Sequence, residues 1–366
     1  VSRLDRLIKE LCPDGVEYIS VGSVVNYEQP TKYIVKSTDY NDDFLIPVLT
    51  AGQSFILGYT NEKDNLYNAS KENPVIIFDD FTGAFKWVDF PFKVKSSAMK
   101  MLTANAYKTT LRYIYHIMGN IGYSSDEHKR LWISIYSEIK IPLPPLAVQC
   151  EIVRILDNFT ELTAELTAEL TARKKQYEYY RDELLTFGDE VEWKTLSDVL
   201  KIKNGKDYKQ FGEGNIPVYG SGGIMTYIDT FVLDKPSVLI PRKGSIDKLY
   251  YVDVPFWTVD TIFYTEIYTN VVIPKFVFYY LQKEHLEQYN TAGGVPSLTQ
   301  TVLNRIAFPV PPLSEQERIV SILDKFDALV NDISIGLPAE IQARQKQYEY
   351  YRDKLLSFKE AANEQL

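Results

Sequence analysis

A chain of 366 residues is too long for one ordinary hydrophobic core, so more than one domain is expected. With 45% hydrophobic and 24% charged residues, the composition is that of a folded soluble protein and excludes a largely disordered one. No apolar run approaches the roughly 18 residues that a membrane span requires, and residues 1–11 form a charged amphipathic stretch without a signal-peptide core. We therefore expect a cytoplasmic protein without membrane contact, whose cysteines, Cys12 and Cys150, are incidental reduced thiols.

The net charge of −9 argues at first against nucleic acid as a partner. The acidic excess, however, is concentrated in residues 151–188 and 315–366, whereas residues 1–150 and 192–310 are close to neutral. Because the neutral segments can carry local basic patches, the net charge alone does not exclude DNA binding.

Residues 15–140 are predicted to form a first, strand-rich globular domain. The run Val-Ile-Ile-Phe at 75–78 consists of residues that favour strands, and Gly, Pro, Asn and Asp turn signals surround it.

A single long helix is predicted from about residue 147 to about residue 187. Leu156, Phe159 and Leu162 begin a stripe of apolar residues at three- and four-residue steps, and Gly188 is expected to cap the end. About 40 residues at 1.5 Å each give roughly 60 Å. A helix of this length is not held by its own propensity, so it needs a long partner.

Residues 190–310 are predicted to form a second strand-rich domain, with β-type runs at 238–240 and 250–252. This domain weakly resembles the first. The matching segments are 14–18 with 189–193, 46–48 with 216–218, and 88–92 with 252–256. The two domains are therefore expected to do related jobs on different targets.

A second long helical segment is predicted from about residue 314 to about residue 358. Gly336 and Pro338 interrupt its apolar pattern, so we expect a kink or a helix–loop–helix break there. Antiparallel packing against the first long helix is the simplest arrangement within one chain.

The two helical segments share nearly identical sequences, which indicates an internal duplication. Gln-Tyr-Glu-Tyr-Tyr-Arg-Asp occurs at 176–182 and again at 347–353. Upstream, each copy has a Pro-Pro-Leu segment, at 144–146 and 311–313, followed by an Ile-Val-x-Ile-Leu-Asp segment. Two similar helical surfaces should be presented to two partners.

This layout closely resembles the specificity (S) subunit of type I restriction–modification systems over essentially the whole chain. The resemblance rests on the paired Pro-Pro-Leu…Ile-Val-x-Ile-Leu-Asp segments, the paired Tyr-x-x-Tyr-Arg-Asp ends and the Thr-Ala-Glu-Leu tandem at 163–170. The first helix is shorter than the second by the length of one Thr-Ala-Glu-Leu unit, so the two halves are imperfectly equivalent.

The resemblance implies an α+β fold in which two strand-rich α/β target-recognition domains are separated by two long antiparallel helices, a coiled-coil-like spacer with a pseudo-twofold repeat. The implied boundaries are 1–145 and 189–312 for the recognition domains, and 146–188 and 313–366 for the spacer helices.

The function implied by the resemblance is recognition of double-stranded DNA without chemistry. Each recognition domain would read one half of an interrupted target, while the helices set the spacing and dock two modification (methyltransferase) subunits. Restriction (translocase–nuclease) subunits would join through the complex. The chain itself would bind no cofactor, whereas the complex would use S-adenosylmethionine in its modification subunits and ATP with Mg²⁺ in its restriction subunits.

The sequence itself predicts no catalytic, cofactor-binding or metal-binding constellation. It has neither a phosphate-binding loop nor an amino-methyltransferase motif, and its histidines are widely scattered. Glu138 and Lys140 form only a fragment of a nuclease-like pattern. Asp79 and Asp80 are expected to cap a turn or to accept a hydrogen bond from a base rather than to hold a metal. The glycine-rich loop at 220–223 is expected to be a plain turn or to approach DNA closely.

Basic and amide-bearing loops are the candidate DNA contacts, in which lysines bind phosphates and other polar side chains read bases. In the first domain these residues are Lys32, Lys36, Thr50, Gln53, Lys86, Lys93, Lys95, Ser96, Ser97 and Lys100. In the second domain they are Lys203, Asn204, Lys206, Tyr208, Ser221, Arg242, Lys243, Ser245 and Lys248. For each residue taken singly, a solvated surface without function is the alternative.

The repeated aromatic segment is the candidate interface for the modification subunits, because aromatic and Arg residues are favoured interface anchors. Its residues are Gln176, Tyr177, Tyr179, Tyr180, Arg181, Gln347, Tyr348, Tyr350, Tyr351 and Arg352. The alternative for Tyr177 and Tyr180 is a place in the core between the two helices.

Two further hypotheses come from other functional classes. A structural scaffold whose coiled coil spaces two protein-binding modules would show no sequence-selective DNA binding. An enzyme, such as a fused modification protein, would require a cofactor motif, and the sequence has none.

Overall fold

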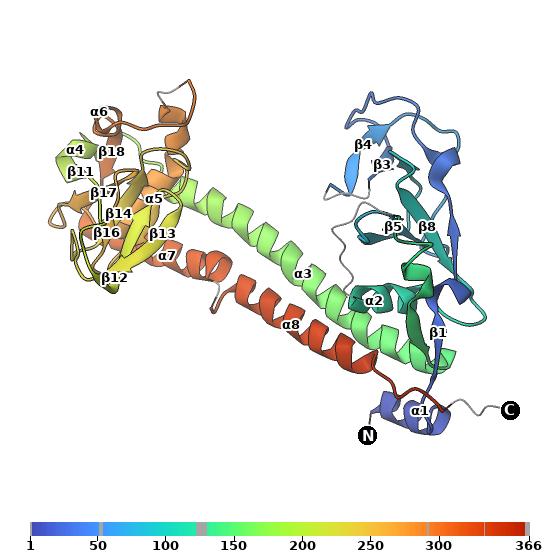
Figure 1. Ribbon diagram of the computed structural model, residues 1–366. Coiled ribbons are helices and arrows are strands. Elements are labelled where there is room, and N and C mark those ends of the chain that lie inside the picture. The colour runs from blue at the N-terminus through green and yellow to red at the C-terminus, as the bar shows by residue number, and fades with distance from the viewer. Residues whose placement is uncertain (1, 51–53, 122–129, 291–292, 333, 363–366) are drawn as a thin grey trace. The chain divides into compact units, whose positions relative to one another are not determined.

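The structure is a computed structural model that describes residues 2–50, 54–121, 130–290, 293–332 and 334–362. The chain divides into two compact units. Unit 1 consists of Val1–Glu165 and Gln342–Leu366, and unit 2 consists of Leu166–Ile341. Each unit therefore contains one strand-rich region together with parts of both predicted helical segments (Figure 1).

Unit 1 is built from two small sheets, a two-stranded ladder and helices. The first sheet has the order β2-β8-β5-β6, the second the order β4-β3-β7, and β1 pairs with β9. The elements are α1 (Arg3–Leu11), β1 (Glu17–Ser20), η1 (Val21–Ser23), β2 (Val25–Glu28), η2 (Pro30–Tyr33), β3 (Ile46–Leu49), β4 (Ile56–Thr60), β5 (Val75–Asp79), β6 (Phe85–Val88), β7 (Lys93–Val94), β8 (Met99–Ala104), α2 (Leu111–Ile121), η3 (Tyr136–Glu138) and β9 (Lys140–Leu143).

Strand β5 is the buried centre of unit 1, as its continuous apolar run predicted. Ile76 and Phe78 belong to the same hydrophobic cluster as Ile114 on α2. On the opposite face of the strand, Val75 and Ile77 belong to the cluster that includes the second sheet. Because successive side chains of a strand point to opposite faces, the sheet is covered on both sides.

Unit 2 contains a matching strand for each strand of unit 1, in the same order along the chain. Its sheets have the orders β11-β17-β14-β15 and β13-β12-β16, and β10 pairs with β18. The elements are β10 (Glu192–Thr195), α4 (Leu196–Val199), β11 (Leu200–Asn204), β12 (Glu213–Gly220), β13 (Gly223–Ile228), β14 (Ser237–Pro241), β15 (Tyr250–Val252), β16 (Trp257–Thr258), β17 (Ile262–Ile267), α5 (Pro274–Lys283), η4 (Leu286–Tyr289), α6 (Gln300–Leu303) and β18 (Ala307–Val310).

The two strand-rich regions correspond strand by strand. If β2 is matched with β11, β3 with β12 and so on in chain order, all three sheets have the same strand order in both units. The details agree as well: β3 and β12 each make a parallel pair with a two-residue strand, and each hairpin has a register shift after Val48 or Val218. The weak sequence similarity between the domains therefore reflects a common fold.

The long helical segments have the predicted form. The first is one helix, α3 (Leu146–Leu184). The second is broken into α7 (Leu313–Asn331) and α8 (Leu337–Leu355), as Gly336 and Pro338 predicted. A side chain at Gly336 would lie 2.4 Å from the carbonyl oxygen of Ala328, so the connection between α7 and α8 requires glycine. Gly188 lies beyond the last turn of α3 and has no left-handed backbone, so the predicted glycine cap is wrong.

Within each unit, α3 packs against an antiparallel part of the second helical segment (Figure 1). In unit 1, Phe159 stacks on Tyr351 with a centroid distance of 5.3 Å. In unit 2, Tyr180 stacks on Phe326 at 5.7 Å. Phe159 and Phe326 occupy matching places in the repeat, as do Tyr180 and Tyr351. The two contacts are therefore one reciprocal pair, as expected of a pseudo-twofold repeat.

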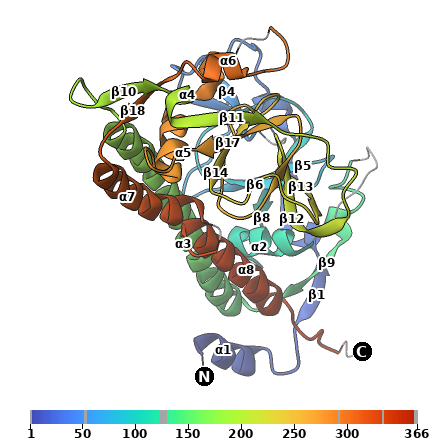
Figure 2. The same ribbon diagram turned by 90° about the vertical axis from the view of Figure 1, so that its left-hand side faces the viewer.

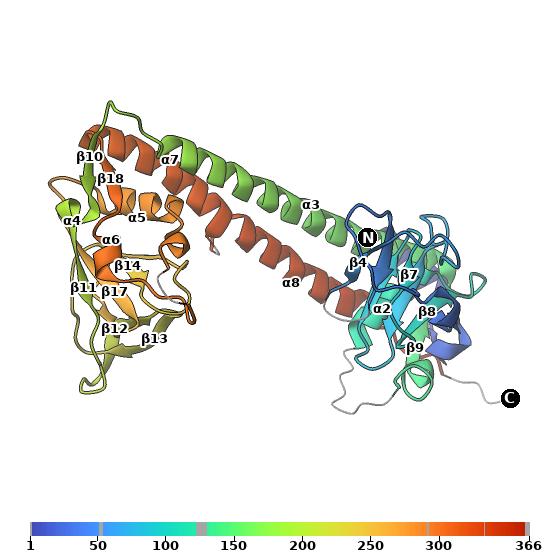
Figure 3. The ribbon, with the colours of Figure 1, turned by 90° about the horizontal axis from the view of Figure 1, so that it is seen from above.

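A helix of each strand-rich region lies against these long helices. In unit 1, α2 lies beside α8, where His116 contacts Tyr348 (Figure 2). In unit 2, α5 lies between β14 and α7 (Figure 3). The helices α2 and α5 thus connect the sheets of their own unit to the long helical segments.

Candidate functional site

Several loops of unit 2 meet at one edge of its two sheets, and we refer to them as the unit 2 loop cluster. It consists of residues 205–209, 220–223, 242–248 and 259–261. The N–H of Arg242 donates to the carbonyl oxygen of Thr261 at 2.8 Å, and the N–H of Ser221 donates to the Thr261 hydroxyl at 3.3 Å. The hydroxyl of Tyr250 donates to the carbonyl oxygen of Ser221. These bonds hold the loops together as one surface.

Glycines allow this close approach. A side chain at Gly205 would lie 2.0 Å from the carbonyl oxygen of Val259, so only glycine fits there. Gly223 and Gly244 have φ angles of 113° and 81°, which other residues rarely adopt. The loop at 220–223 leads from β12 into β13 and is therefore a hairpin turn in the cluster, in agreement with one of its two predicted roles.

The structure brings most of the predicted DNA contacts of the second domain into this cluster. Lys206, Lys243 and Lys248 are exposed there. Half-buried residues of the same cluster are Tyr208, Ser221, Arg242 and Ser245. Lys203 and Asn204 lie on β11 instead, where Lys203 forms an ion pair with Glu266 and Asn204 accepts a hydrogen bond from Gln300. A hollow of about 500 Å³ beside the cluster is lined by Asp207, Tyr208, Lys209, Met225, Val259, Asp260 and Thr261.

Arg242 is the arginine of this cluster. Its guanidinium lies over the ring of Phe263, 5.8 Å from the ring centroid, in a cation–π contact. Among the residues that the structure describes, no carboxylate forms an ion pair with it. A supported guanidinium without an acidic partner is suited to a bidentate contact with a guanine.

The matching place in unit 1 is occupied by an acid. The N–H of Asp80 donates to the carbonyl oxygen of Ala98, just as the N–H of Arg242 donates to that of Thr261. Both residues directly follow the corresponding strands β5 and β14. The two units therefore share a framework but differ in charge at this position.

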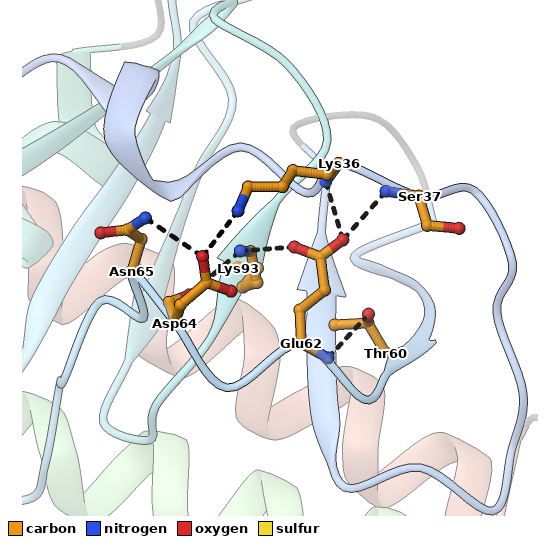
Figure 4. A network of polar contacts seen from close by, with 7 residues as sticks. All are labelled: Lys36, Ser37, Thr60, Glu62, Asp64, Asn65 and Lys93. Carbon is orange, nitrogen blue, oxygen red and sulfur yellow. Dashed lines mark hydrogen bonds and ion pairs between the residues drawn. The ribbon is translucent and has the colours of Figure 1, made fainter.

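Two predicted DNA contacts of the first domain are wrong, because Lys93 and Lys100 are fully buried. Lys93 Nζ lies 2.7 Å from Glu62 Oε2 and donates to the carbonyl oxygen of Asp64 (Figure 4). Lys100 Nζ lies 2.9 Å from Asp80 Oδ2. Both lysines point into the interior, where a charge is tolerated only when it is paired. They belong to the interior of the domain and cannot reach phosphates.

The network around Lys93 joins strand β7 to two loops of unit 1, one at Lys36–Ser37 and one at Glu62–Asn65 (Figure 4). Glu62 also accepts hydrogen bonds from the N–H groups of Lys36 and Ser37. Burial acts to raise the pKa of the Glu62 carboxyl, but the interactions with Lys93 and with the two N–H groups outweigh it and lower the pKa. Glu62 is therefore held as a carboxylate. Lys36 itself forms an ion pair with Asp64 at 2.7 Å.

The remaining candidates of the first domain lie nearer the surface. Those that are exposed are Lys32, Lys36, Lys86, Lys95, Ser96 and Ser97, whereas Thr50 is half-buried and Gln53 lies outside the described residues. Lys32 pairs with Glu28 at 2.7 Å. Asp79 accepts hydrogen bonds from the N–H groups of Phe81 and Thr82, so it caps a turn as expected.

The repeated aromatic segment presents the same surface on α3 and on α8. Tyr179 and Tyr350 are 64% and 61% exposed. Each lies edge-on against the tyrosine that follows it, with centroid distances of 5.4 Å to Tyr180 and 5.3 Å to Tyr351. Exposed aromatic pairs at matching places are suited to two copies of one partner. Gln347 is exposed and Gln176 half-buried beside them.

Other residues of the segment face inward, which corrects the prediction. Tyr177 is buried and its hydroxyl donates to Gln282, so the alternative of a core residue holds. Arg181 is also buried and hydrogen-bonds to Asp182. The corresponding Tyr348 and Arg352 are half-buried, and Tyr348 hydrogen-bonds to His116. Packing within each unit leaves Tyr179 and Tyr350 outside, whereas Tyr180 and Tyr351 also stack on Phe326 and Phe159.

Sequence reasoning missed the residues that join each strand-rich region to the long helices. Gln149 and Gln316 are fully buried and bind backbone atoms on both sides of this joint. Asp157 accepts hydrogen bonds from Arg112 and His116 in unit 1. Both glutamines lie three residues after a Pro-Pro-Leu segment, so their repetition at matching places of the duplication could have identified them.

Asp324 makes the corresponding joint in unit 2, through Lys275 and Tyr279. In unit 1, burial acts to raise the pKa of Asp157, but the hydrogen bonds from His116 and Arg112 outweigh it and lower the pKa. Both aspartates end an Ile-Leu-Asp segment of the repeat.

The described part of the chain contains neither a metal-binding cluster nor a membrane-spanning helix. No group of three or more His, Cys, Asp or Glu side chains there is placed to hold a metal ion. No described helix has the length and apolar character of a membrane span.

Comparison with known proteins identifies the family. The family described as "Type I restriction modification DNA specificity domain" matches residues 13–173 and 188–343, once for each half of the duplication. The chain belongs to this family of type I specificity subunits. It is 46% identical to the EcoR124I/EcoR124II specificity subunit of Escherichia coli over 98% of both chains. It is 32% identical to a putative type I specificity subunit of Haemophilus influenzae over 84% of this chain and 86% of that one.

A solved structure shares the fold of this specificity subunit. The S subunit of a type I system from M. genitalium matches with a TM-score of 0.63 at 16% identity, over 93% of this chain and 96% of that one. The family predicted from the sequence motifs is confirmed, and so is the α+β fold with an internal repeat. As a specificity subunit, the chain is a non-catalytic DNA-recognition component of a type I restriction–modification system.

Proposed function

We propose that the strand-rich regions of units 1 and 2 each read one half of an interrupted double-stranded DNA target. In domain terms, residues 1–145 and 189–312 are the recognition domains, and residues 146–188 and 313–366 are spacer helices that set the gap. The observation that supports this most is a shared framework with different chemistry at its loops. Asp80 and Arg242 occupy matching positions but have opposite charges.

Exchange of one domain tests this proposal. Residues 189–312 are replaced by the matching domain of another specificity subunit, and the methylated sequence is determined in cells that contain the modification subunit. One half of the target should change while the other half stays the same. A simultaneous change in both halves would contradict independent reading, and loss of all sequence selectivity would favour the scaffold hypothesis.

We further propose that the tyrosine pairs Tyr179–Tyr180 and Tyr350–Tyr351 bind two modification subunits, one at each copy of the repeat. Those subunits supply S-adenosylmethionine chemistry, and restriction subunits that join through the complex use ATP with Mg²⁺. The support is the closely similar exposure and ring geometry of the two pairs.

Charged substitutions test the proposed interface. Tyr179→Asp should leave a complex with one modification subunit, as should Tyr350→Asp, and the double variant should bind none. Glu183→Ala, at an exposed position on α3, serves as the control. Native mass spectrometry gives the subunit ratio directly. Full occupancy in the double variant would place the partner elsewhere on the chain.

A further inference from the structure

In each unit, the segment that follows the central strand is joined to a second loop by a backbone hydrogen bond. In unit 2, the N–H of Leu298 donates to the carbonyl oxygen of Arg242 at 2.9 Å. In unit 1, the N–H of Leu131 donates to the carbonyl oxygen of Asp80 at 2.8 Å. These two joints are therefore equivalent positions in the two recognition domains.

An arginine stands at both joints, but on opposite sides of the hydrogen bond. In unit 2 it is Arg242, on the strand side. In unit 1 the strand side has Asp80, and the residue directly before Leu131 is Arg130. Arg130 is exposed over 55% of its side chain, and its Nη1 lies 4.0 Å from Asp80 Oδ2. The carbonyl oxygen of Arg130 accepts a hydrogen bond from Ser134, which fixes the backbone of this loop.

The side chains beneath the joint also differ, in agreement with the different position of the arginine in the two units. Phe263 lies under Arg242, and the strand register places Lys100 at the corresponding position in unit 1. Lys100 pairs with Asp80, and it donates a hydrogen bond to Gln29. In unit 2 the ring of Phe263 thus contacts Arg242 directly. In unit 1 the buried Lys100 binds Asp80, which in turn faces Arg130.

Asp80 has an acceptor left for Arg130. Its Oδ1 accepts a hydrogen bond from the N–H of Trp132 at 2.8 Å. Its Oδ2 is buried and pairs with Lys100 Nζ at 2.9 Å, and a carboxylate oxygen that binds one donor still has a second lone pair. This oxygen can hold one edge of the guanidinium and leave the other edge free for a base, because arginine has donors on two edges.

We infer that Arg130 is a specificity-determining residue of the first recognition domain, where it reads a guanine, and that Asp80 positions it. This inference rests on the proposed reading of one half-site by each domain. Lysine is a poor substitute in this role, because a single ammonium group cannot both bind Asp80 with one planar edge and present a second planar edge to O6 and N7 of guanine.

The test uses the complex of the full chain with its modification subunits. Methylation rates are measured on duplexes in which each target base pair is replaced in turn, for the parent chain and for Arg130→Ala, Arg130→Lys and Arg6→Ala. Discrimination at one position of one half-site should fall roughly 5- to 150-fold in both Arg130 variants. Arg6→Ala, an exposed arginine of α1 outside any site, should leave every preference unchanged.

The positioning role is tested with Asp80→Asn combined with Lys100→Met, which removes the buried charge pair as a whole. Discrimination should fall at the same base position as in Arg130→Ala, while the other half-site is read normally. Full discrimination in this double variant would refute the positioning role. If its unit 1 fails to fold, the Arg130 variants still decide the inference, because Arg130 is on the surface.

Three other outcomes overturn the inference. Unchanged discrimination in Arg130→Ala would show that this arginine reads no base. An equal loss on every sequence, with a weaker salt dependence, would make it a phosphate contact. Full discrimination in Arg130→Lys would show that reading does not need a guanidinium held by Asp80. Losses spread over both half-sites would instead contradict the proposed function itself.

Discussion

Gln149 is predicted to be the main polar link between the strand-rich region of unit 1 and α3. Its side chain is fully buried and takes part in four hydrogen bonds. It accepts from the hydroxyl of Thr109 and the N–H of Thr110, and it donates to the carbonyl oxygens of Lys108 and Pro144. Gln149→Met keeps the length of the side chain but removes all of these bonds.

The structure gives the size of the effect. At about 1 kcal/mol for each hydrogen bond, the substitution should lower the free energy of opening in unit 1 by about 4 kcal/mol. Gln316 makes three such bonds in unit 2, so Gln316→Met should cost about 3 kcal/mol there. Gln345→Met, at an exposed position of α8, should change stability by less than about 0.5 kcal/mol.

Hydrogen exchange of the full chain resolves the two units separately, which a single melting curve does not. In Gln149→Met, the protected amides of α2 and β9 should exchange roughly a thousandfold faster, while those of α5 and β18 keep their rates. Gln316→Met should show the reverse pattern. A change below about 1 kcal/mol, or an equal change in both units, would refute the assignment of these glutamines as local links.

Three further predictions follow from the joints, the spacer and the loops. The pKa of Asp157 is lower in the folded state than in the unfolded state. Its hydrogen bonds to Arg112 and His116 therefore stabilise unit 1 fully when the pH is above the unfolded-state pKa, and this stabilisation is lost as the pH falls through the folded-state pKa. Asp157→Asn should therefore weaken the acid dependence of exchange in unit 1, and an unchanged dependence would contradict this cause. One Thr-Ala-Glu-Leu unit inserted after Leu170 lengthens the helix by about 6 Å and rotates its far end by about 40° beyond a full turn. This angle is close to the rotation between neighbouring DNA base pairs. Methylome sequencing should then show both half-sites kept and the gap longer by one base pair, or by two, whereas an unchanged gap would exclude these units as spacers. Lys206→Ala should weaken binding on all sequences and reduce the salt slope by about one, and a loss confined to one sequence would show base reading instead.

The sequence was most informative where physical constraints are periodic or repeated. The stripe that begins at Leu156 predicted a single long helix, and Gly336 and Pro338 predicted the break in the second one. The repeated Tyr-x-x-Tyr-Arg-Asp segment predicted two equivalent surfaces, and both tyrosine pairs are exposed.

The direction of individual polar side chains was much less predictable. Lys93 and Lys100 are residues of a type that commonly contacts DNA. Both, however, lie at inward-facing positions of strands, where Glu62 and Asp80 neutralise them. Burial of a paired lysine depends on partners that are distant in sequence, which no local pattern reveals. The buried Arg181 was misplaced for the same reason, because its surroundings include residues of a different segment.

The equivalence of Asp80 and Arg242 also required the strand register. The two segments around them share no sequence motif, and only the matching backbone hydrogen bonds align them. A one-residue error in register would have placed each side chain on the wrong face of its sheet.

Methylome sequencing of a host with and without this chain tests the central claim most directly. The strain that contains the chain should show one additional methylated motif, made of two specified halves with an unspecified gap of fixed length between them. The motif should be absent from the strain without the chain. A continuous motif, or the same methylation in both strains, would contradict the account of two recognition domains that read separate half-sites.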